Sequence, residues 1–276
     1  ISQADMRKKH RAFLKWAGGK YGLSDVISKI LPKGDCLIEP FVGAGSIFLN
    51  TDYPKYILND INKDLINLYK ILQTKPDAFI QDAKALFSIE NNQSERYYQF
   101  RKEFNGSDDS YFRSLIFLYM NRHGYNGLCR YNKRGGYNVP FGRYKHPYFP
   151  KEELLYFSEK AQNATFIQGD FETAFSQLDV NDVVYCDPPY SPINPTSNFT
   201  AYAGNSFTDS DQKRLVVCAE VAKKKNIPTL ISNHYVDFTK ELYKNANKHK
   251  LLQVQRSISQ KGKGRIKVKE ILALYK

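Results

Sequence analysis

The sequence predicts a doubly wound α/β fold whose sheet is interrupted by a mostly helical insertion. Three observations support this prediction. Short apolar runs typical of buried parallel strands occur near both ends of the chain. Two of these runs are followed by polar or glycine-containing segments, where open α/β sheets bind their ligands. Strand patterns are missing between about residues 62 and 149, where apolar residues recur at helical spacing.

The first part of the chain reads as one α/β unit. Pro32 and Gly34 end its first helix, because neither residue suits a continued helix. In chain order the predicted elements are a helix over 23–31, a strand over 35–40, an apolar segment over 41–50 and a short strand over 55–58 that ends in Asn59 and Asp60.

The remaining elements divide the chain into a sheet domain, residues 1–61 and 150–276, and an inserted domain, residues 62–149. The predicted helices of the insertion cover 61–72, 77–87, 95–104 and 111–121. The later elements of the sheet domain are strands over 165–167, 183–186, 229–231, 251–258 and 268–275 and a helix over 212–224. Residues 1–5, ahead of Met6, are interpreted as a leader or an appended remnant outside the fold.

A tetrapeptide at positions 187–190 follows an apolar strand, so it is predicted to lie at the ligand-binding edge of the sheet. Its residues suit methyl transfer to an amino nitrogen. Asp187 can accept one amino hydrogen, the Pro188 carbonyl can accept the other, and Tyr190 can stack on the ring. The alternative is a strand-end turn in which the aspartate caps and the prolines stop strand pairing.

A glycine-containing loop is the second signal. Gly43 and Gly45 permit a tight turn and close backbone approach, so a cofactor can lie against this loop and the helix that follows it. The pattern departs from the G-x-G-x-x-G dinucleotide fingerprint, which argues against a nicotinamide oxidoreductase. Asp60, at the end of the next strand, is placed to bind ribose hydroxyls, with a helix cap as the alternative.

The composition predicts a globular protein that binds a polyanion. Of the 276 residues, 42% are hydrophobic, and 41 Lys and Arg against 28 Asp and Glu give a formal charge of +13. No apolar run reaches the roughly 18 residues of a membrane span, and the N-terminus lacks a signal-peptide pattern, so a cytoplasmic protein is expected. The four cysteines have no paired spacing, which indicates neither a disulfide framework nor a zinc cluster.

An acid-free segment between Asp109 and Glu152 carries the strongest nucleic-acid signal, because arginine, lysine and tyrosine are interleaved there. Residues 133–136 read as the turn of a β-hairpin, which would fit the major groove of DNA. Arg130 can bridge guanine O6 and N7. An aromatic core under a basic rim is the alternative.

Other residues of this segment suit contacts with bases. Leu128 and Pro140 can touch a thymine methyl group, while Tyr125 and Asn126 can enter the gap left by a displaced base. A further basic stretch, Arg256–Lys269, is interpreted as a solvated hairpin loop, with phosphate contact as the alternative.

The chain resembles the Dam-type DNA adenine-N6 methyltransferases from about Lys9 to its end, because six of its motifs occur in the order found in that family. They are Phe13–Lys20, Glu39–Ser46, Tyr125–Asn132, Asn138–Tyr144, Asp187–Tyr190 and Glu270–Lys276. Several independent motifs in order are far more specific than any one. The differences lie in the leader and at the hairpin tip, Lys133–Tyr137, which leaves the tip contacts open.

The resemblance implies a Rossmann-like methyltransferase sheet with an inserted helical and β-hairpin DNA-recognition domain. It implies transfer of methyl from S-adenosylmethionine, which becomes S-adenosylhomocysteine, to N6 of an adenine flipped out of GATC, without a metal. The implied catalytic residues are Asp187, Pro188, Pro189 and Tyr190. The residues implied to bind the methyl donor are Trp16, Lys20, Phe41, Gly43, Gly45, Asp60, Asp170 and Asp187.

For DNA, the resemblance places Arg130 on a guanine, Lys15 on the outer guanine and Tyr125 at the flipping site. The full set implied to contact DNA is Lys15, Arg101, Tyr125, Asn126, Leu128, Arg130, Asn132, Pro140, Arg143 and Tyr144. Three cofactor residues have structural alternatives: Trp16 as core, Lys20 as a surface charge and Asp170 as a helix cap.

Two other functions stay open at this point. The same scaffold could methylate cytosine N4, an RNA adenine or a protein glutamine, and a basic hairpin without catalysis would serve a DNA-binding protein. The intact tetrapeptide and glycine loop argue against the second. The expected protein is a monomeric bacterial or phage enzyme that binds double-stranded DNA and no membrane.

Overall fold

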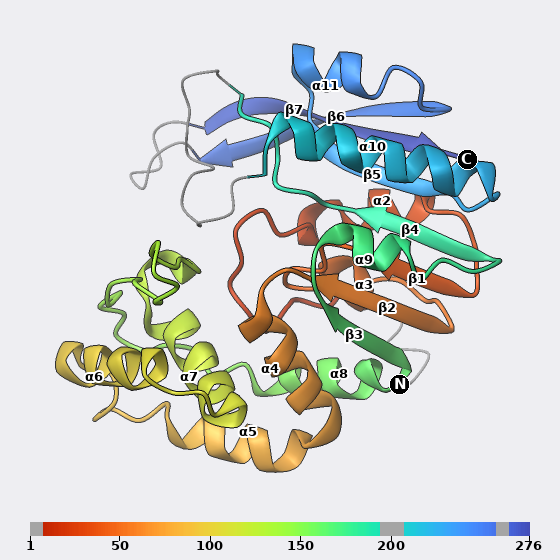
Figure 1. Cartoon of the computed structure of the whole chain (residues 1–276). Helices are drawn as coiled ribbons and strands as arrows, with labels where there is room; N and C mark the ends of the chain where they lie inside the picture. The colour runs from red at the N-terminus through yellow and green to blue at the C-terminus, as the bar shows by residue number, and fades with distance from the viewer. Residues whose placement is uncertain (1–7, 194–206, 258–264) are drawn as a thin grey trace.

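The computed structural model describes residues 8–193, 207–257 and 265–276 (Figure 1). The leader, and Lys261 and Lys263 of the basic stretch, lie outside the described residues. Seven strands form one sheet in the order β3-β2-β1-β4-β5-β7-β6. They are β1 (Cys36–Glu39), β2 (Lys55–Asp60), β3 (Ala164–Gln168), β4 (Asp182–Cys186), β5 (Thr229–His234), β6 (Lys248–Ser257) and β7 (Arg265–Tyr275).

The sheet is doubly wound, as the sequence predicts. Strands β1 to β5 are parallel, and β7 runs antiparallel to both β5 and β6. The chain moves from β1 outward to β3 and then returns to the other side of β1 to form β4. The strand order therefore reverses between β1 and β4, which is where folds of this type bind ligands.

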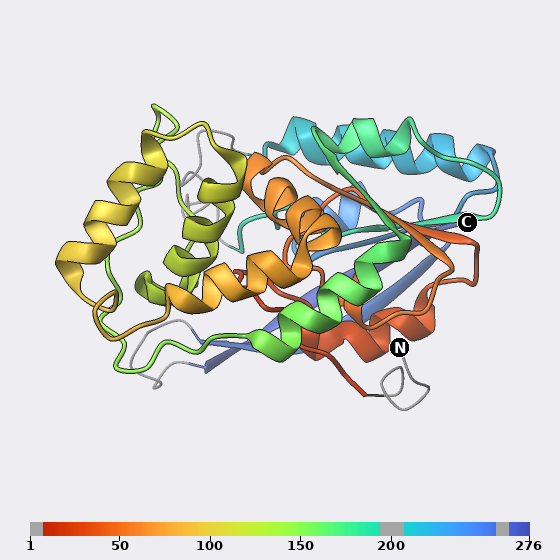
Figure 2. The same ribbon diagram turned by 90° about the horizontal axis from the view of Figure 1, so that it is seen from below.

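Alternating side chains of the central strands divide the core into two layers. Leu37 of β1 and Tyr185 of β4 belong to one cluster of buried residues, whereas Ile38 and Cys186 belong to the other. The first layer packs against α2 (Ser24–Ile30), α3 (Ser46–Leu49), α4 (Lys63–Thr74) and α8 (Lys151–Lys160), and the second against α9 (Phe171–Phe175), α10 (Asp209–Lys224) and α11 (Asp237–Leu242) (Figure 2). Burial on both faces explains why these strands read as continuous apolar runs.

The insertion consists of helices α4, α5 (Pro76–Ala85), α6 (Ser94–Asn105) and α7 (Ser110–His123), followed by a long loop. These helices lie close to their predicted ranges. Helix α4 contacts β2 and β3 as well as α7, so it connects the insertion to the sheet (Figure 1). The short 3-10 helices are η1 (Tyr21–Leu23), η2 (Tyr125–Gly127) and η3 (Ala161–Asn163). Among the described residues, no helix has the length and apolar character to cross a membrane.

The predicted hairpin is formed by two arms that pair through isolated bridges, Gly124 with Phe141 and Tyr131 with Tyr137, and not through continuous strands. Side chains form hydrogen bonds with backbone groups that continuous strand pairing would otherwise use. Arg101 Nη1 donates to the Val139 carbonyl at 3.0 Å, and Asn105 accepts from the Tyr137 amide at 2.8 Å. The helical segment therefore holds the arms in place of a regular ribbon.

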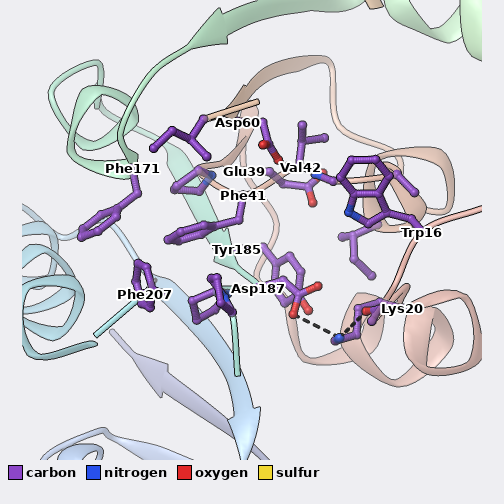
Figure 3. Close-up of a pocket in the computed structure, with 18 of the residues that line it drawn as sticks. Trp16, Lys20, Glu39, Phe41, Val42, Asp60, Phe171, Tyr185, Asp187 and Phe207 are labelled. Atoms are coloured by element: carbon purple, nitrogen blue, oxygen red, sulfur yellow. Dashed lines mark hydrogen bonds and ion pairs between the residues drawn. The ribbon is translucent and has the colours of Figure 1, made fainter. Parts of the chain in front are cut away.

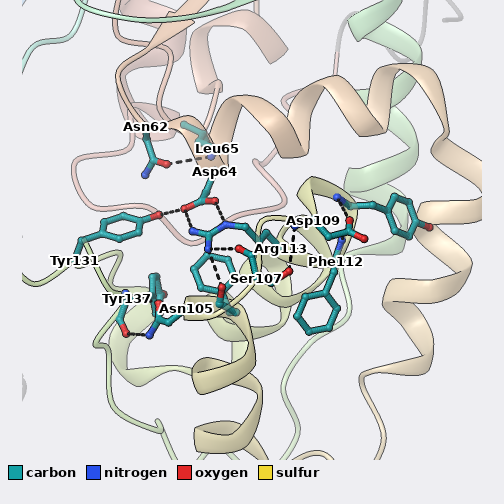
Figure 4. A network of polar contacts seen from close by, with 12 residues as sticks. Asn62, Asp64, Leu65, Asn105, Ser107, Asp109, Phe112, Arg113, Tyr131 and Tyr137 are labelled. Atoms are coloured by element: carbon teal, nitrogen blue, oxygen red, sulfur yellow. Dashed lines mark hydrogen bonds and ion pairs between the residues drawn. The ribbon is translucent and has the colours of Figure 1, made fainter. Parts of the chain in front are cut away.

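One arginine of the acid-free segment belongs to the interior. Arg113 donates to both oxygens of Asp64 at 3.0 and 3.2 Å and to the carbonyls of Phe104 and Ser107 (Figure 4). Tyr131 donates to the same carboxylate at 2.7 Å. This network ties α4, α7 and the hairpin together, so Arg113 has a structural role.

Replacing Tyr131 with phenylalanine should lower the free energy of unfolding by about 1.5 kcal/mol, because a hydrogen bond to a charged group is lost in a half-buried site. Urea denaturation would measure the change. Tyr148, which is exposed and donates to Glu153 at 3.0 Å, provides a matched control. Its phenylalanine variant should change stability by less than about 0.5 kcal/mol. Equal losses in the two variants would contradict the assigned role of the network.

Candidate active site

A cavity of about 840 Å³ opens at the carboxyl ends of β1 and β4 (Figure 3). All of the residues predicted to be catalytic or to bind the methyl donor line it. They are Trp16, Lys20, Phe41, Gly43, Gly45, Asp60, Asp170, Asp187, Pro188, Pro189 and Tyr190. Segments that are far apart in the sequence thus meet at the point where the strand order reverses, as expected for a doubly wound sheet.

Asp187, directly after β4, lies opposite a buried cation. Lys20 Nζ is 3.1 Å from Asp187 Oδ1, and its side chain is 6% exposed (Figure 3). The same ammonium donates to the Gly18 carbonyl at 2.6 Å and lies 4.4 Å from the centre of the Tyr190 ring. Lys20 is therefore part of the site and not a surface charge. Its contact with the tetrapeptide was not predicted.

The Asp187 carboxyl is held in a defined position with one oxygen engaged. Ser232 Oγ donates to Oδ1 at 3.2 Å, the same oxygen that Lys20 contacts. Among the described residues, Oδ2 has no protein donor within hydrogen-bond distance. Burial raises the pKa of Asp187, while Lys20 and Ser232 oppose that rise. A lysine partner therefore favours the ionised form that can accept a hydrogen bond.

The rest of the tetrapeptide is fixed by buried amides from neighbouring elements. Gln212 Nε2, on α10, donates to the Pro189 carbonyl at 2.8 Å, and Asn233 Oδ1, at the end of β5, accepts from the Ser191 amide at 2.9 Å. Asn233 Nδ2 also donates to Gln212 Oε1 at 3.2 Å. These hydrogen bonds hold the turn that follows β4 on both sides.

Glu39, the last residue of β1, is a site residue that the sequence reasoning missed. It lines the cavity, is 2% exposed, and its Oε2 has no hydrogen-bond partner among the described residues. Burial, and then the nearby Asp187, raise the pKa of Glu39 well above its ordinary value. A buried oxygen without a partner is costly, so a donor group bound in the cavity would be stabilised there.

The free energy of unfolding of the Glu39→Gln variant should rise relative to that of the wild type as pH rises. The folded-state pKa of Glu39 is raised, so the stability that its neutral form contributes is present at acid pH and is lost as pH rises through that pKa. Urea denaturation of both proteins at pH 5, 7 and 9 would measure the difference. A difference in stability that stays constant over this range would contradict the raised pKa.

The glycine loop is bound to the end of β2. Asp60 Oδ2 accepts from the Gly43 amide and Oδ1 from the Asn62 amide, each at 3.0 Å. The side chain of Asn62, and not that of Asp60, caps α4. Gly43 and Gly45 have positive φ of 51° and 83°, and a Cβ at Gly43 would lie 3.1 Å from Trp16 Nε1. The loop therefore needs glycine both for its backbone and for the indole beside it.

The far wall of the cavity is aromatic. Phe41, Phe171 and Phe207 lie around one another with ring centroids 5.4 to 5.7 Å apart (Figure 3). Asp170, beside this wall, caps α9 and pairs with Arg214 at 2.7 Å. The hydrogen bond from Arg214 is the main reason that the pKa of Asp170 is lowered. The helix-cap interpretation of Asp170 is thus observed, although the residue also lines the cavity.

The residues predicted to contact DNA lie outside this cavity, mostly in the insertion. Lys15 Nζ lies 4.3 Å from the centre of the Tyr144 ring, and the Tyr144 hydroxyl accepts from the Asn126 amide at 2.9 Å. These three residues therefore form one cluster. Asn132 is exposed and its side chain accepts from two amides of the hairpin tip. Tyr125, Leu128, Arg130 and Pro140 are half-buried, and Arg143 is exposed.

Arg130 and Arg101 already make protein contacts. Arg130 Nε and Nη2 donate to the side chain and the carbonyl of Asn138 at 2.8 and 3.0 Å. Arg101 reaches the backbone of the opposite arm and lies 4.7 Å from the centre of the Tyr98 ring. Two tyrosines of the basic segment, Tyr119 and Tyr137, are buried, so the core interpretation holds for those two.

A doubly wound sheet, a glycine loop after β1 and a binding cavity beside β4 together define the Rossmann-like methyltransferase fold. Comparison with known proteins identifies the family. Residues 16–258 match the family described as D12 class N6 adenine-specific DNA methyltransferase. The chain therefore belongs to this family, whose members methylate adenine N6 in DNA.

Curated relatives agree with this assignment. The DNA adenine methylase of Escherichia coli strain K12 is 58% identical over 269 residues, which cover 98% of this chain and 96% of that protein. The DNA adenine methylase of Vibrio cholerae O1 strain O395 is 56% identical with 97% of each chain covered, and that of Serratia marcescens is 55% identical with 98% and 100% covered. A solved C-terminal domain of precorrin-6Y C5,15-methyltransferase from Rhodobacter capsulatus covers the whole chain at 10% identity, but its TM-score of 0.39 is too low to support an argument.

Proposed function

We propose that this enzyme methylates N6 of an adenine flipped out of duplex DNA within the sequence GATC, with S-adenosylmethionine as the methyl donor. The observation that carries the proposal is the half-buried Asp187 carboxylate in the cavity wall, with one oxygen fixed by Lys20 and Ser232. The donor supplies an electrophilic methyl group on a sulfonium when it is bound.

The cavity residues fit this donor. Lys20 provides a cation for its carboxylate, Glu39 an acceptor for its ammonium, and Asp60 an acceptor for its ribose hydroxyls. Phe41 and Phe171 offer apolar faces for its adenine ring. The unpaired Glu39 Oε2 is the structural support for this fit, because a bound ammonium would satisfy it.

Asp187 and the Pro188 carbonyl act on the substrate nitrogen. The N6 lone pair of adenine is delocalised into the ring, so the amino group is a poor nucleophile until its hydrogens are held. Asp187 accepts one hydrogen and the Pro188 carbonyl the other, which directs the lone pair toward the methyl group. The carboxylate also stabilises the positive charge that develops on N6, so catalysis is positioning plus electrostatic stabilisation.

The base must leave the helix to reach this site, because its Watson–Crick edge is paired in the duplex. Tyr190 holds the extruded ring by stacking, and Tyr125 and Asn126 occupy the space that it leaves. Arg130 and Lys15 read guanines of the target, while Leu128 and Pro140 contact thymine methyl groups. Arg101, Asn132, Arg143 and Tyr144 position the duplex through contacts near its backbone.

The direct test is incubation with labelled S-adenosylmethionine and matched duplexes with and without GATC, followed by digestion to nucleosides. Label in N6-methyl-2′-deoxyadenosine from the GATC duplex alone is the expected result. Equal labelling of both duplexes would reject GATC specificity. Label in N4-methyl-2′-deoxycytidine would reject the assignment of the acceptor base, and labelling of single strands at the same rate would reject base flipping from a duplex.

A further inference from the structure

Strands β6 and β7 extend beyond the sheet as a two-stranded arm. Strand β5 pairs with β7 as far as His234 with Glu270, and the Tyr235 amide just after β5 still donates to the Lys269 carbonyl at 2.9 Å. Beyond that pair, β6 and β7 continue to pair with each other as far as Ser257 with Arg265. We call residues 253–257 and 265–269 the β6–β7 arm. At about 3.4 Å per residue, Lys267 lies about 10 Å past the last pair with β5.

The β6–β7 arm and the insertion extend past the same edge of the sheet, the edge at which the parallel strands end. The arm extends to the left at the top of the sheet in Figure 1, and the insertion lies below it on the same side of the molecule; Figure 2 agrees. The active-site cavity lies at the same edge, at the ends of β1 and β4. In the sheet these two strands lie between β2 and β3, which the insertion connects, and β7 and β6, which form the arm. A duplex bound to the insertion over the active site would therefore have the arm on its other side.

The arm is basic throughout. No acidic residue occurs from Lys248 to Lys269. Lys267 and Lys269 are exposed, and the pairing register places them on one face of the arm, opposite Gln255 and Gln253. Two cations and two amides on one face are all possible donors to phosphate oxygens. Exposed like charges on one strand repel each other, so a polyanion bound there would be stabilised.

We propose that the β6–β7 arm binds the sugar–phosphate backbone of the substrate duplex, with Lys267 and Lys269 as the contacting cations. The inference rests on the proposed function in one respect, namely that the substrate is duplex DNA. Lysine is a compact charge without the planar fork of arginine, so these contacts hold the duplex without reading its sequence. The insertion and the arm then bind the duplex on both sides of the flipped base.

The test compares two double variants that each remove two positive charges from the same ribbon. In K267Q/K269Q the changes lie on the arm. In the matched control, K248Q/K250Q, they lie at the opposite end of β6, where Lys248 pairs with Leu274 and Lys250 with Leu272 and both side chains are exposed. Duplex affinity is measured at several salt concentrations with GATC and altered duplexes, and methylation is measured at saturating DNA.

The arm variant should bind every duplex more weakly and should lower the slope of log affinity against log salt by about 2, because each lost phosphate contact contributes about 0.9. The ratio of its Kd to that of the wild type should thus be about tenfold larger at 50 mM salt than at 200 mM salt. The control variant should keep the wild-type slope, and methylation at saturating DNA should be unchanged in both.

Three results would overturn the inference. They are a wild-type slope in K267Q/K269Q, equal losses in the two double variants, which would indicate an effect of net charge alone, and a loss of GATC discrimination or of turnover at saturating DNA. Failure of the proposed function is seen separately in the wild type, as an absence of duplex binding or of GATC methylation. The three results above count against the arm when the wild-type protein itself binds and methylates the duplex.

Discussion

Replacing Asp187 with alanine should lower the rate of methyl transfer by at least about 10²- to 10³-fold while leaving most of the affinity for duplex DNA, since one preorganised electrostatic contact is worth about that much in rate. The variant loses the acceptor for an N6 hydrogen and the charge that stabilises developing positive charge on N6. The insertion and the β6–β7 arm are unchanged, so DNA binding should persist. Single-turnover methylation and duplex binding measure the two quantities separately.

An asparagine at position 187 is the sharper variant. Its amide is nearly isosteric with the carboxylate and can still accept a hydrogen bond, but it has no charge, and Lys20 then lies buried without its anion. We again expect a large loss of rate. Asp237→Asn, an exposed position in the first turn of α11, should behave like the wild type. Substantial turnover by a folded Asp187→Ala or Asp187→Asn protein would reject the proposed mechanism.

The sequence was sufficient to predict the cavity because its residues follow strands that can be recognised locally. The runs before Asp187 and Gly43 are apolar because both faces of β4 and β1 are buried, and the carboxyl ends of parallel strands meet at one edge. Residues from three separate parts of the chain could therefore be placed together before the structure was known. The strand pattern accounts for Gly43, Asp60 and Asp187, whereas Trp16 and Lys20 follow no strand and were assigned to the donor site by the resemblance to the family.

The residues that support the site were missed because their roles depend on tertiary contacts. Glu39 reads as part of the loop motif, and its burial results from β4 lying beside β1. Gln212 reads as an ordinary helix residue, although it bonds the Pro189 carbonyl. A signal for Ser232 and Asn233 was present, since three polar residues, Ser232, Asn233 and His234, end the buried strand β5 beside the strand that precedes Asp187.

Local pattern also misjudged parts of the insertion and its flanks. Helix α8 was not predicted, although Leu154 and Phe157 give it a buried face. The hairpin was predicted as a regular ribbon, but Asn126 and Gly127 have positive φ, of 54° and 59°, which interrupts the extended backbone of one arm. Side chains from α6 then take the backbone groups that a ladder would have paired.

Replacing Arg130 with alanine should reduce methylation of GATC far more than methylation of duplexes altered at the guanine pair that Arg130 reads. A bidentate arginine–guanine contact is worth about 1–3 kcal/mol, so discrimination at that pair should fall by roughly 5- to 150-fold. In the structure Asn138 accepts two hydrogen bonds from the guanidinium, at 2.8 and 3.0 Å, which limits its freedom before DNA binds.

Two further variants separate base reading from charge. Arg130→Lys keeps the charge but loses the planar fork, so it should lose discrimination while keeping the salt dependence of the wild type. Arg134→Ala, at the exposed hairpin tip, removes the same charge and should affect all duplexes alike. The measurement is kcat/KM on GATC and on each single-pair variant at two salt concentrations. Arg130→Ala could instead lower kcat/KM on every duplex by one common factor and reduce the slope of log affinity against log salt by about one. In that case Arg130 contacts a phosphate and does not read the guanine.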